Sequence, residues 1–180
     1  MSQSGVQLQQ AADAQIAELI DLLSTRDPSA LKLQCRGRER LGDGTVAASA
    51  MHTADNYHRI ADFLRANDHR PRAPREAKRN HRLPRFARTP GHAAGHSTES
   101  HPRSPGYSAR DIDLRRLVER LSTAREALRP LASLSDQQLA TIPPASDMKF
   151  CDGRRTLQQA LASLLNHQRH QLDALIRTLQ

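Results

Sequence analysis

The chain has few of the residues that sheets and membrane spans require. Of its 180 residues, 3% are aromatic, with no Trp, two Tyr and three Phe. Sandwiches and barrels depend on aromatic and β-branched side chains, so this scarcity argues against both. No stretch reaches the roughly 18 uninterrupted apolar residues of a membrane span. Residues 1–10 lack the basic start and apolar centre of a signal peptide. We therefore expect a protein without membrane association.

Cysteine is almost as rare as the aromatic residues. Cys35 and Cys151 lie far apart in the sequence and form no CxxC pair. Such usage does not indicate a disulfide framework, and it favours a reducing, cytoplasmic location. Cys151 precedes an expected helix, whose dipole could lower the pKa of the thiol. The alternative is an inert, buried thiol at that position.

Leu, Ala, Gln, Glu and Arg dominate the chain, and these residues favour helices. Apolar residues recur at three- and four-residue spacing in four segments, each long enough for an amphipathic helix. The expected helices cover residues 4–26, 45–65, about 113–130 and about 155–179, and a short helical turn is expected at 135–140. Four such helices without a strand candidate predict an all-α fold, a four-helix bundle.

A basic segment separates the second expected helix from the third. Residues 69–110 hold ten of the 27 basic residues, six of the ten prolines and five of the nine histidines, with only two acids. So polar and Pro-rich a segment cannot bury enough surface to offset its ordering entropy. We predict one bundle domain, formed by 1–68 and 111–180, interrupted by a long disordered insertion at 69–110.

Three interpretations of the insertion stay open. Its arginines could neutralise phosphates and bind nucleic acid weakly, although aromatic residues for base stacking are scarce. The insertion's histidines could scavenge metal ions. The third interpretation is a solvated loop in an arginine-rich chain, which contains 24 Arg and 3 Lys.

Four histidines lie outside the insertion, two in each of two expected helices. His52 and His58 belong to the second helix, and His167 and His170 to the last. Residues three apart project about 60° apart on a helix, so His167 and His170 could hold one ion, as could His52 and Asp55. Alternatively, each histidine is a solvated or boundary residue. Asp55 could also accept a hydrogen bond that orients His52, or be a solvated surface carboxylate.

Two strings around these histidines resemble a known family. GDGTVAASAMHTADNY, residues 42–57, is similar to the second-helix signature of the DinB/YfiT-like superfamily, in which a Ser/Thr-Val pair opens the helix and a His follows. RTLQQALASLLNHQRHQLDALI, residues 155–176, resembles the fourth-helix signature, in which His begins an HxxxH pair. The resemblance covers nearly the whole chain outside the insertion.

The resemblance implies an up-down-down-up four-helix bundle with a divalent metal, Zn, Ni or Fe, between its second and fourth helices. The family's ligands are three histidines, and two of these positions match His52 and His167 here. The third falls on Gln171, and the neighbouring His170 is the expected substitute, with Asp55 as an auxiliary ligand. Neutral imidazoles suit borderline divalent metals, and an open position can activate water or a thiol.

The first functional hypothesis is therefore a DinB-like metal-dependent transferase, isomerase or hydrolase, or a degenerate relative. Its substrate is an unidentified small molecule, with a low-molecular-weight thiol implied by the family alone. The second hypothesis is a non-enzymatic helical scaffold whose arginine-rich insertion binds nucleic acid. The third is a catalytically silent bundle that forms a homodimer. The patterns of a di-iron carboxylate bundle, HExxH, the P-loop and GxGxxG are absent.

Overall fold

The computed structural model describes residues 2–38, 41–66, 107–108, 112–146 and 148–180. Within these ranges the chain forms helices and no β-strand, which confirms the all-α prediction. The elements are α1 (Gln3–Ser24), the 3₁₀ helix η1 (Pro28–Lys32), α2 (Val46–Ala66), α3 (Leu114–Ala127), the 3₁₀ helix η2 (Arg129–Ser133), α4 (Asp136–Leu139) and α5 (Leu157–Leu179). The sequence placed the helix ends within a few residues of these bounds.

Side-chain caps explain where the long helices begin. The Ser2 hydroxyl accepts a hydrogen bond from the backbone N–H of Gly5 at 2.9 Å, and Asp113 accepts from the first turn of α3. Thr156 forms a reciprocal capping box with Gln159 at the start of α5. Each cap satisfies N–H groups that lack a partner inside the helix. These caps fix the register with which the apolar stripes face the interior.

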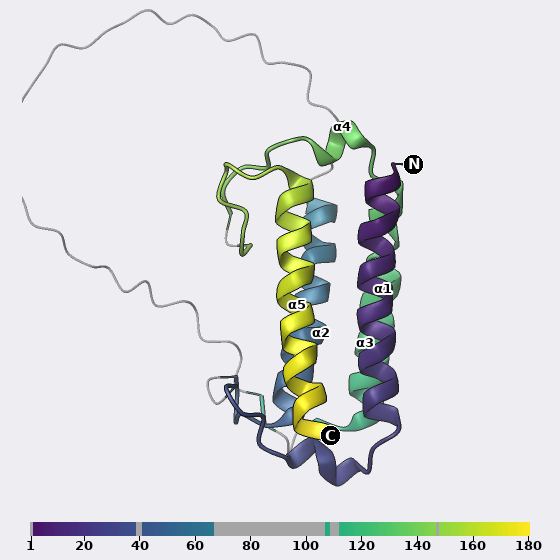
Figure 1. Ribbon diagram of the computed structural model, residues 1–180, viewed down its shortest axis with the longest axis vertical. Coiled ribbons are helices and arrows are strands. Elements are labelled where there is room, and N and C mark those ends of the chain that lie inside the picture. Colours follow the sequence, from purple (N-terminus) through teal and green to yellow (C-terminus); the bar gives the residue numbers. More distant parts are fainter. Residues whose placement is uncertain (1, 39–40, 67–106, 109–111, 147) are drawn as a thin grey trace, which may run out of the picture.

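The four long helices lie side by side, each against two others. α1 and α2 each pack against both α3 and α5. In Figure 1, α1 and α5 run downward, whereas α2 and α3 run upward. α2 and α3 are therefore parallel. Most of the predicted insertion, 69–110, occupies the connection between these two helices and lies outside the described residues.

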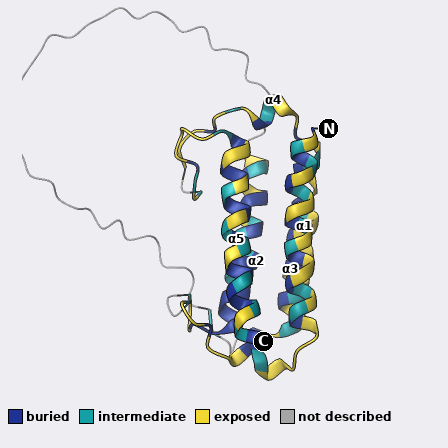
Figure 2. Ribbon diagram, in the orientation of Figure 1, coloured by how far each residue is buried: buried dark blue, intermediate teal, exposed yellow. Residues whose placement is uncertain are grey.

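The interior is built mainly from leucine, isoleucine and alanine. Figure 2 shows where the buried residues lie along the helices. The largest fully buried side chains are Tyr57, Ile16, Leu19, Ile60, Leu117, Leu121, Leu128, Leu131, Leu139, Leu157, Leu161 and Leu172. α2 contributes mostly small residues, among them Ala47, Ala50 and Ala54. Short side chains allow neighbouring helices to approach closely, so the polar residues interspersed along α2 lie near α3 and α5.

Tyr107 belongs to the segment that the sequence assigned to the insertion, yet it packs on the core. Its carbonyl accepts a hydrogen bond from the Asp43 N–H at 3.0 Å. Gly42 has φ +60°, and a Cβ there would lie 2.2 Å from the same carbonyl. Only glycine tolerates both that conformation and that approach. The chain leading into α3 is thereby attached at the beginning of α2.

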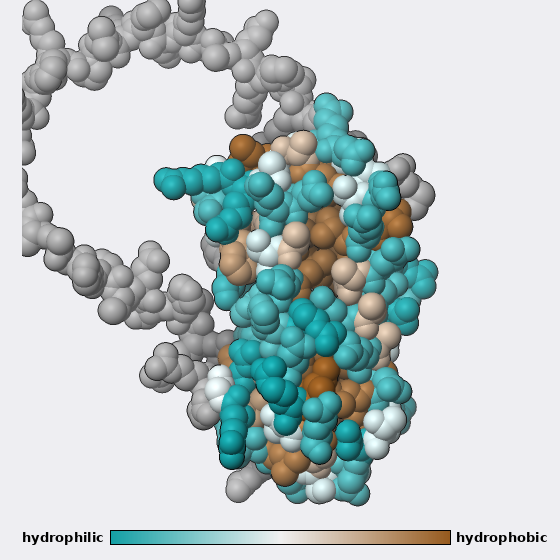
Figure 3. All heavy atoms as spheres, viewed as in Figure 1, coloured by the Kyte–Doolittle hydropathy of each residue, from teal (hydrophilic) through white to brown (hydrophobic). Residues whose placement is uncertain are grey.

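None of the helices in the described ranges is long and apolar enough to cross a bilayer. Figure 3 shows one face of the molecule coloured by hydropathy. Hydrophilic side chains cover much of that face, and apolar side chains show mainly in a strip between the helices.

Candidate functional site

His167 lies near the middle of α5 and is partly buried. Its Nε2 atom is 3.2 Å from the side-chain nitrogen of Gln171, one turn further along α5. Lys149 Nζ, on the loop before α5, lies 3.5 Å from the same Nε2. Both neighbours are donors, so Nε2 is the unprotonated nitrogen of a neutral imidazole that accepts from them. Burial first, and then the positive charges of Lys149 and Arg38, lower the pKa of His167 to about 4.

His52 is the corresponding imidazole on α2, and it is also partly buried. Burial lowers the pKa of His52, Asp55 opposes this, and the cations Arg59, Arg38 and Lys149 add to it. The charge of His52 in turn contributes to the lowered pKa of His167. The two rings therefore share one electrostatic neighbourhood, with the same two cations beside both. At neutral pH both rings are uncharged and each offers a lone pair.

Three buried polar atoms near these histidines lack hydrogen-bond partners among the described residues. They are Ser49 Oγ on α2, and Oε1 of Gln168 and of Gln171 on α5. A buried polar atom without a partner costs roughly 1–3 kcal/mol, and native proteins keep few of them. All three lie within one turn of His52 or His167 along their helices. These atoms are therefore unused hydrogen-bonding capacity on α2 and α5.

Two loops bring further groups to this contact. In Figure 1 both loops lie to the left of the α2–α5 pair: the segment before α2 below, and the segment before α5 above. The lower loop carries Arg38, whose guanidinium donates to the carbonyl of His170 at 3.2 Å. The upper loop carries Lys149 and Phe150.

Phe150 has φ +69° and is the one non-glycine residue with positive φ in the described chain. That conformation is strained for a side chain with a Cβ, and such strain concentrates at functional sites. The Phe150 ring meets the His167 ring edge-on, with centroids 6.3 Å apart. Lys149 Nζ lies 5.2 Å from the Phe150 centroid. The strained turn therefore holds an aromatic ring and an ammonium group over His167.

The other two proposed ligands are placed less favourably. His170 is exposed on α5, although its charge still acts on His167. Asp55 forms an ion pair with Arg120 of α3 at 2.5 Å, and it accepts a hydrogen bond from the Tyr107 hydroxyl. To bind a metal, Asp55 would have to release both partners. No group of three or more His, Cys, Asp or Glu side chains among the described residues is arranged to hold a metal ion.

The donor set present fits part of the expected site. His52 and His167 are neutral imidazoles, and Gln171 has a buried carbonyl oxygen without a partner. That residue stands where the family resemblance places its third ligand. Three neutral donors leave the charge of a dication uncompensated, and Lys149 and Arg38 add positive charge. The donors present are therefore two imidazoles and one amide oxygen, with two cations in the same neighbourhood.

The remaining histidine and the cysteines take no part in this contact. His58 Nε2 lies 3.1 Å from the carbonyl of Arg120, so it faces α3. Burial raises the pKa of Cys151, the opposite direction to the helix-dipole effect considered from the sequence. Cys35 is buried, and its sulfur accepts from Thr178 at 3.5 Å. Both cysteines are free.

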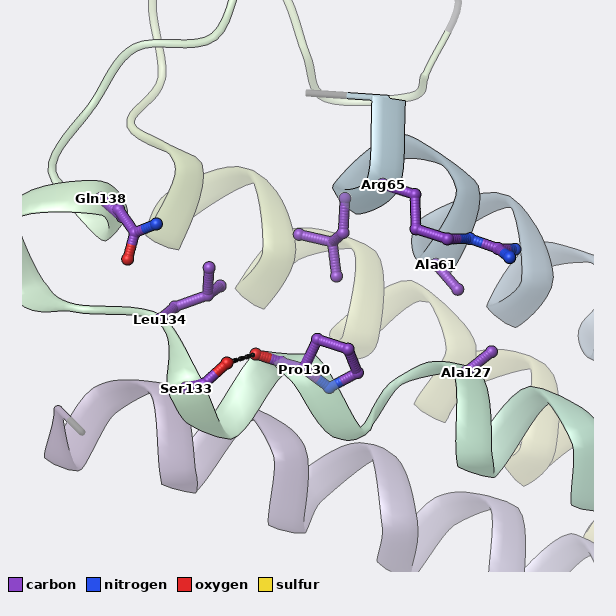
Figure 4. A pocket seen from close by; sticks show the side chains of 8 residues that line it. Ala61, Arg65, Ala127, Pro130, Ser133, Leu134 and Gln138 are labelled. Atoms are coloured by element: carbon purple, nitrogen blue, oxygen red, sulfur yellow. Dashed lines mark hydrogen bonds between the residues drawn. The ribbon is translucent and has the colours of Figure 1, made fainter. Parts of the chain in front are cut away.

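A shallow cavity of about 250 Å³ lies further along α2, between its last turns and η2 (Figure 4). Its lining is mostly apolar and includes Ala61, Leu64 and Leu134. The Ser133 hydroxyl at its edge donates to the Pro130 carbonyl at 2.8 Å. It contains no histidine, cysteine or carboxylate, so it offers no evident chemistry.

Sequence reasoning found the histidines but missed the loop residues beside them. Arg38 and Lys149 carry no local motif, and Lys149 differs from its surroundings only as one of three lysines in an arginine-rich chain. Phe150 gave no signal, because the spacing of residues in the sequence does not predict that an aromatic residue will adopt a positive φ.

Comparisons of the chain with models of protein families, with curated proteins and with solved structures found no match.

Proposed function

We propose that this protein is a DinB-like four-helix bundle of the up-down-down-up type that binds a divalent metal between α2 and α5. The opposite directions of α1 and α5 relative to α2 and α3 support this topology. His52 and His167 are the proposed imidazole ligands, and Gln171 is the proposed oxygen donor. To join them, His170 would have to turn in from its exposed position, and Asp55 would have to give up contacts with Arg120 and Tyr107.

The observation that carries this proposal is the state of the His167 ring. Its Nε2 atom is unprotonated at neutral pH. That atom contacts the Gln171 amide and the Lys149 ammonium, both of which can move aside. A neutral imidazole is the form that binds Zn²⁺ or a similar ion. His52 supplies a second neutral imidazole from the facing helix.

The proposed activity is that of a metal-dependent transferase, isomerase or hydrolase, or of a relative that keeps only the binding site. A bound metal with open positions would supply Lewis acidity toward water or a thiol. The chain's own contribution is to hold both imidazoles neutral by burial and by neighbouring positive charge. Phe150 covers one edge of the His167 ring and limits its exposure to water.

Zinc titration of the untagged full chain by calorimetry tests the proposal. His52→Ala and His167→Ala should each weaken the tightest binding event by about tenfold or more, because each removes one ligand bond. His58→Ala is the matched control, since His58 lies on the same helix but faces α3. The insertion's histidines contribute equally to all these proteins, so differences report on the α2–α5 contact. Identical isotherms for the wild type and both ligand variants would exclude the site.

A further inference from the structure

We propose that the α2–α5 contact binds a small oxyanion, a phosphate or carboxylate group, between Lys149 and Arg38. This function does not require a metal ion and goes beyond the one proposed above. Lys149 and Arg38 come from different loops, before α5 and before α2 respectively. Lys149 Nζ lies 3.5 Å from His167 Nε2, Arg38 donates to the carbonyl of His170, and the charges of both act on His52 and His167. Convergent cations beside a partly buried surface are the usual means of binding an oxyanion.

Neither cation is paired with a carboxylate in the described part of the chain, although seven other ion pairs are present there. Asp55 is a carboxylate whose charge acts on the pKa of His52, and it already forms an ion pair with Arg120. A bound anion would supply the missing negative charge.

Neighbouring groups restrain both Arg38 and Lys149. One Arg38 nitrogen donates to the His170 carbonyl at 3.2 Å, which fixes the guanidinium against α5 and leaves its other N–H groups for a ligand. Lys149 Nζ is positioned by His167 Nε2 at 3.5 Å and by the Phe150 ring at 5.2 Å. The strained backbone of Phe150 maintains this orientation. Such preorganisation lowers the entropic cost of binding.

The Gln171 amide lies beside the His167 ring, with its nitrogen 3.2 Å from His167 Nε2. The side-chain nitrogen of Gln171 donates to His167, and its buried side-chain oxygen has no hydrogen-bond partner among the described residues. That oxygen can accept from the hydroxyl of a protonated phosphate or phosphate ester. A ligand with both acceptor oxygens and one hydroxyl therefore matches the groups present.

The experiment is an NMR titration of the metal-free full chain with inorganic phosphate and, separately, with succinate. Saturable shifts of the Lys149 and Phe150 backbone amides are expected for at least one anion. Stronger binding of phosphate would identify phosphate as the preferred group, and stronger binding of succinate would identify a carboxylate. Observing these amides separates the site from non-specific binding elsewhere on a chain of net charge +8.

Lys149→Met and Arg38→Met should each weaken the anion affinity obtained from these shifts by about tenfold, the typical loss for a hydrogen bond to a charged group. Arg115→Met is the matched control, because it removes the same charge from an exposed position on α3. The inference is overturned if the wild type gives no saturable shift, or if all three variants weaken binding equally. Zinc binding measured on the same samples is a separate readout. Lys149→Met should strengthen zinc binding while weakening anion binding, so the two proposals can fail independently.

Discussion

The neutral state of His167 predicts how the stability of the fold depends on pH. In the folded chain its pKa lies at about 4, whereas an unfolded histidine titrates near 6.5. Between these values the unfolded chain binds more protons than the folded chain. The unfolding free energy therefore loses the contribution of His167 progressively as the pH falls from about 6.5 to about 4. Above that window the ring is neutral in both states and contributes no pH dependence.

The size of this loss follows from the shift. At about 1.36 kcal/mol per pKa unit, the full difference corresponds to about 3.4 kcal/mol. His167 is only partly buried, so solvent screening reduces this figure, and we expect roughly 1–2 kcal/mol. His167→Gln removes the titrating group and should make stability less sensitive to pH within the window by this amount.

Denaturant unfolding at pH 7, 6, 5 and 4, followed by circular dichroism, measures the difference between the two proteins. Other groups also titrate in this range, so only the difference between the wild type and His167→Gln carries the argument. His170→Gln is the control, because it removes an exposed histidine from the same helix and should leave the effect of His167 in place. Parallel curves for the wild type and His167→Gln would refute a neutral, partly buried ring.

Three further predictions concern the neighbours of the two imidazoles. Gln171→His adds an imidazole one turn after His167 and should strengthen zinc binding about tenfold or more in calorimetry; unchanged affinity would exclude position 171 from the site. Lys149→Met should raise the pKa of His167 in an NMR titration and strengthen zinc binding by up to about thirtyfold, because a dication at about 4 Å from an ammonium is repelled by roughly 2 kcal/mol in water; a lower pKa would contradict this. Asp55→Asn removes the carboxylate that opposes the other influences on His52, so the pKa of His52 should fall, whereas a rise would show that Asp55 acts differently.

Local patterns in the sequence were sufficient to predict the helices. The apolar spacing of α5 and its Thr156 cap both follow from chemistry within a few residues, so the helix began where expected. The same holds for α1, which ends shortly before Pro28. Tyr107 was assigned to the insertion because its neighbours are polar and Pro-rich. Its contacts with α2 depend on tertiary structure and leave no local pattern.

The candidate site was only partly predictable for the same reason. Helical periodicity places His167 and His170 near each other and predicts that His170 turns further toward solvent than Gln171, and in the structure His170 is exposed and Gln171 is buried. Asp55 shares a helix with His52, yet its main partners come from α3 and from Tyr107. Lys149 and Arg38 reach the imidazoles from loops whose conformations depend on Phe150 and on the α5 backbone. Such long-range contacts require the folded structure.

The most direct test of a shared site is a zinc titration of the ¹⁵N-labelled protein, followed through the ring nitrogens of its histidines. If His52 and His167 bind one ion, their ring signals will change together and reach their end points at the same zinc concentration, while His58 stays unchanged. If the His52 and His167 signals change at different zinc concentrations, or if only one of them changes, the two imidazoles do not share a metal.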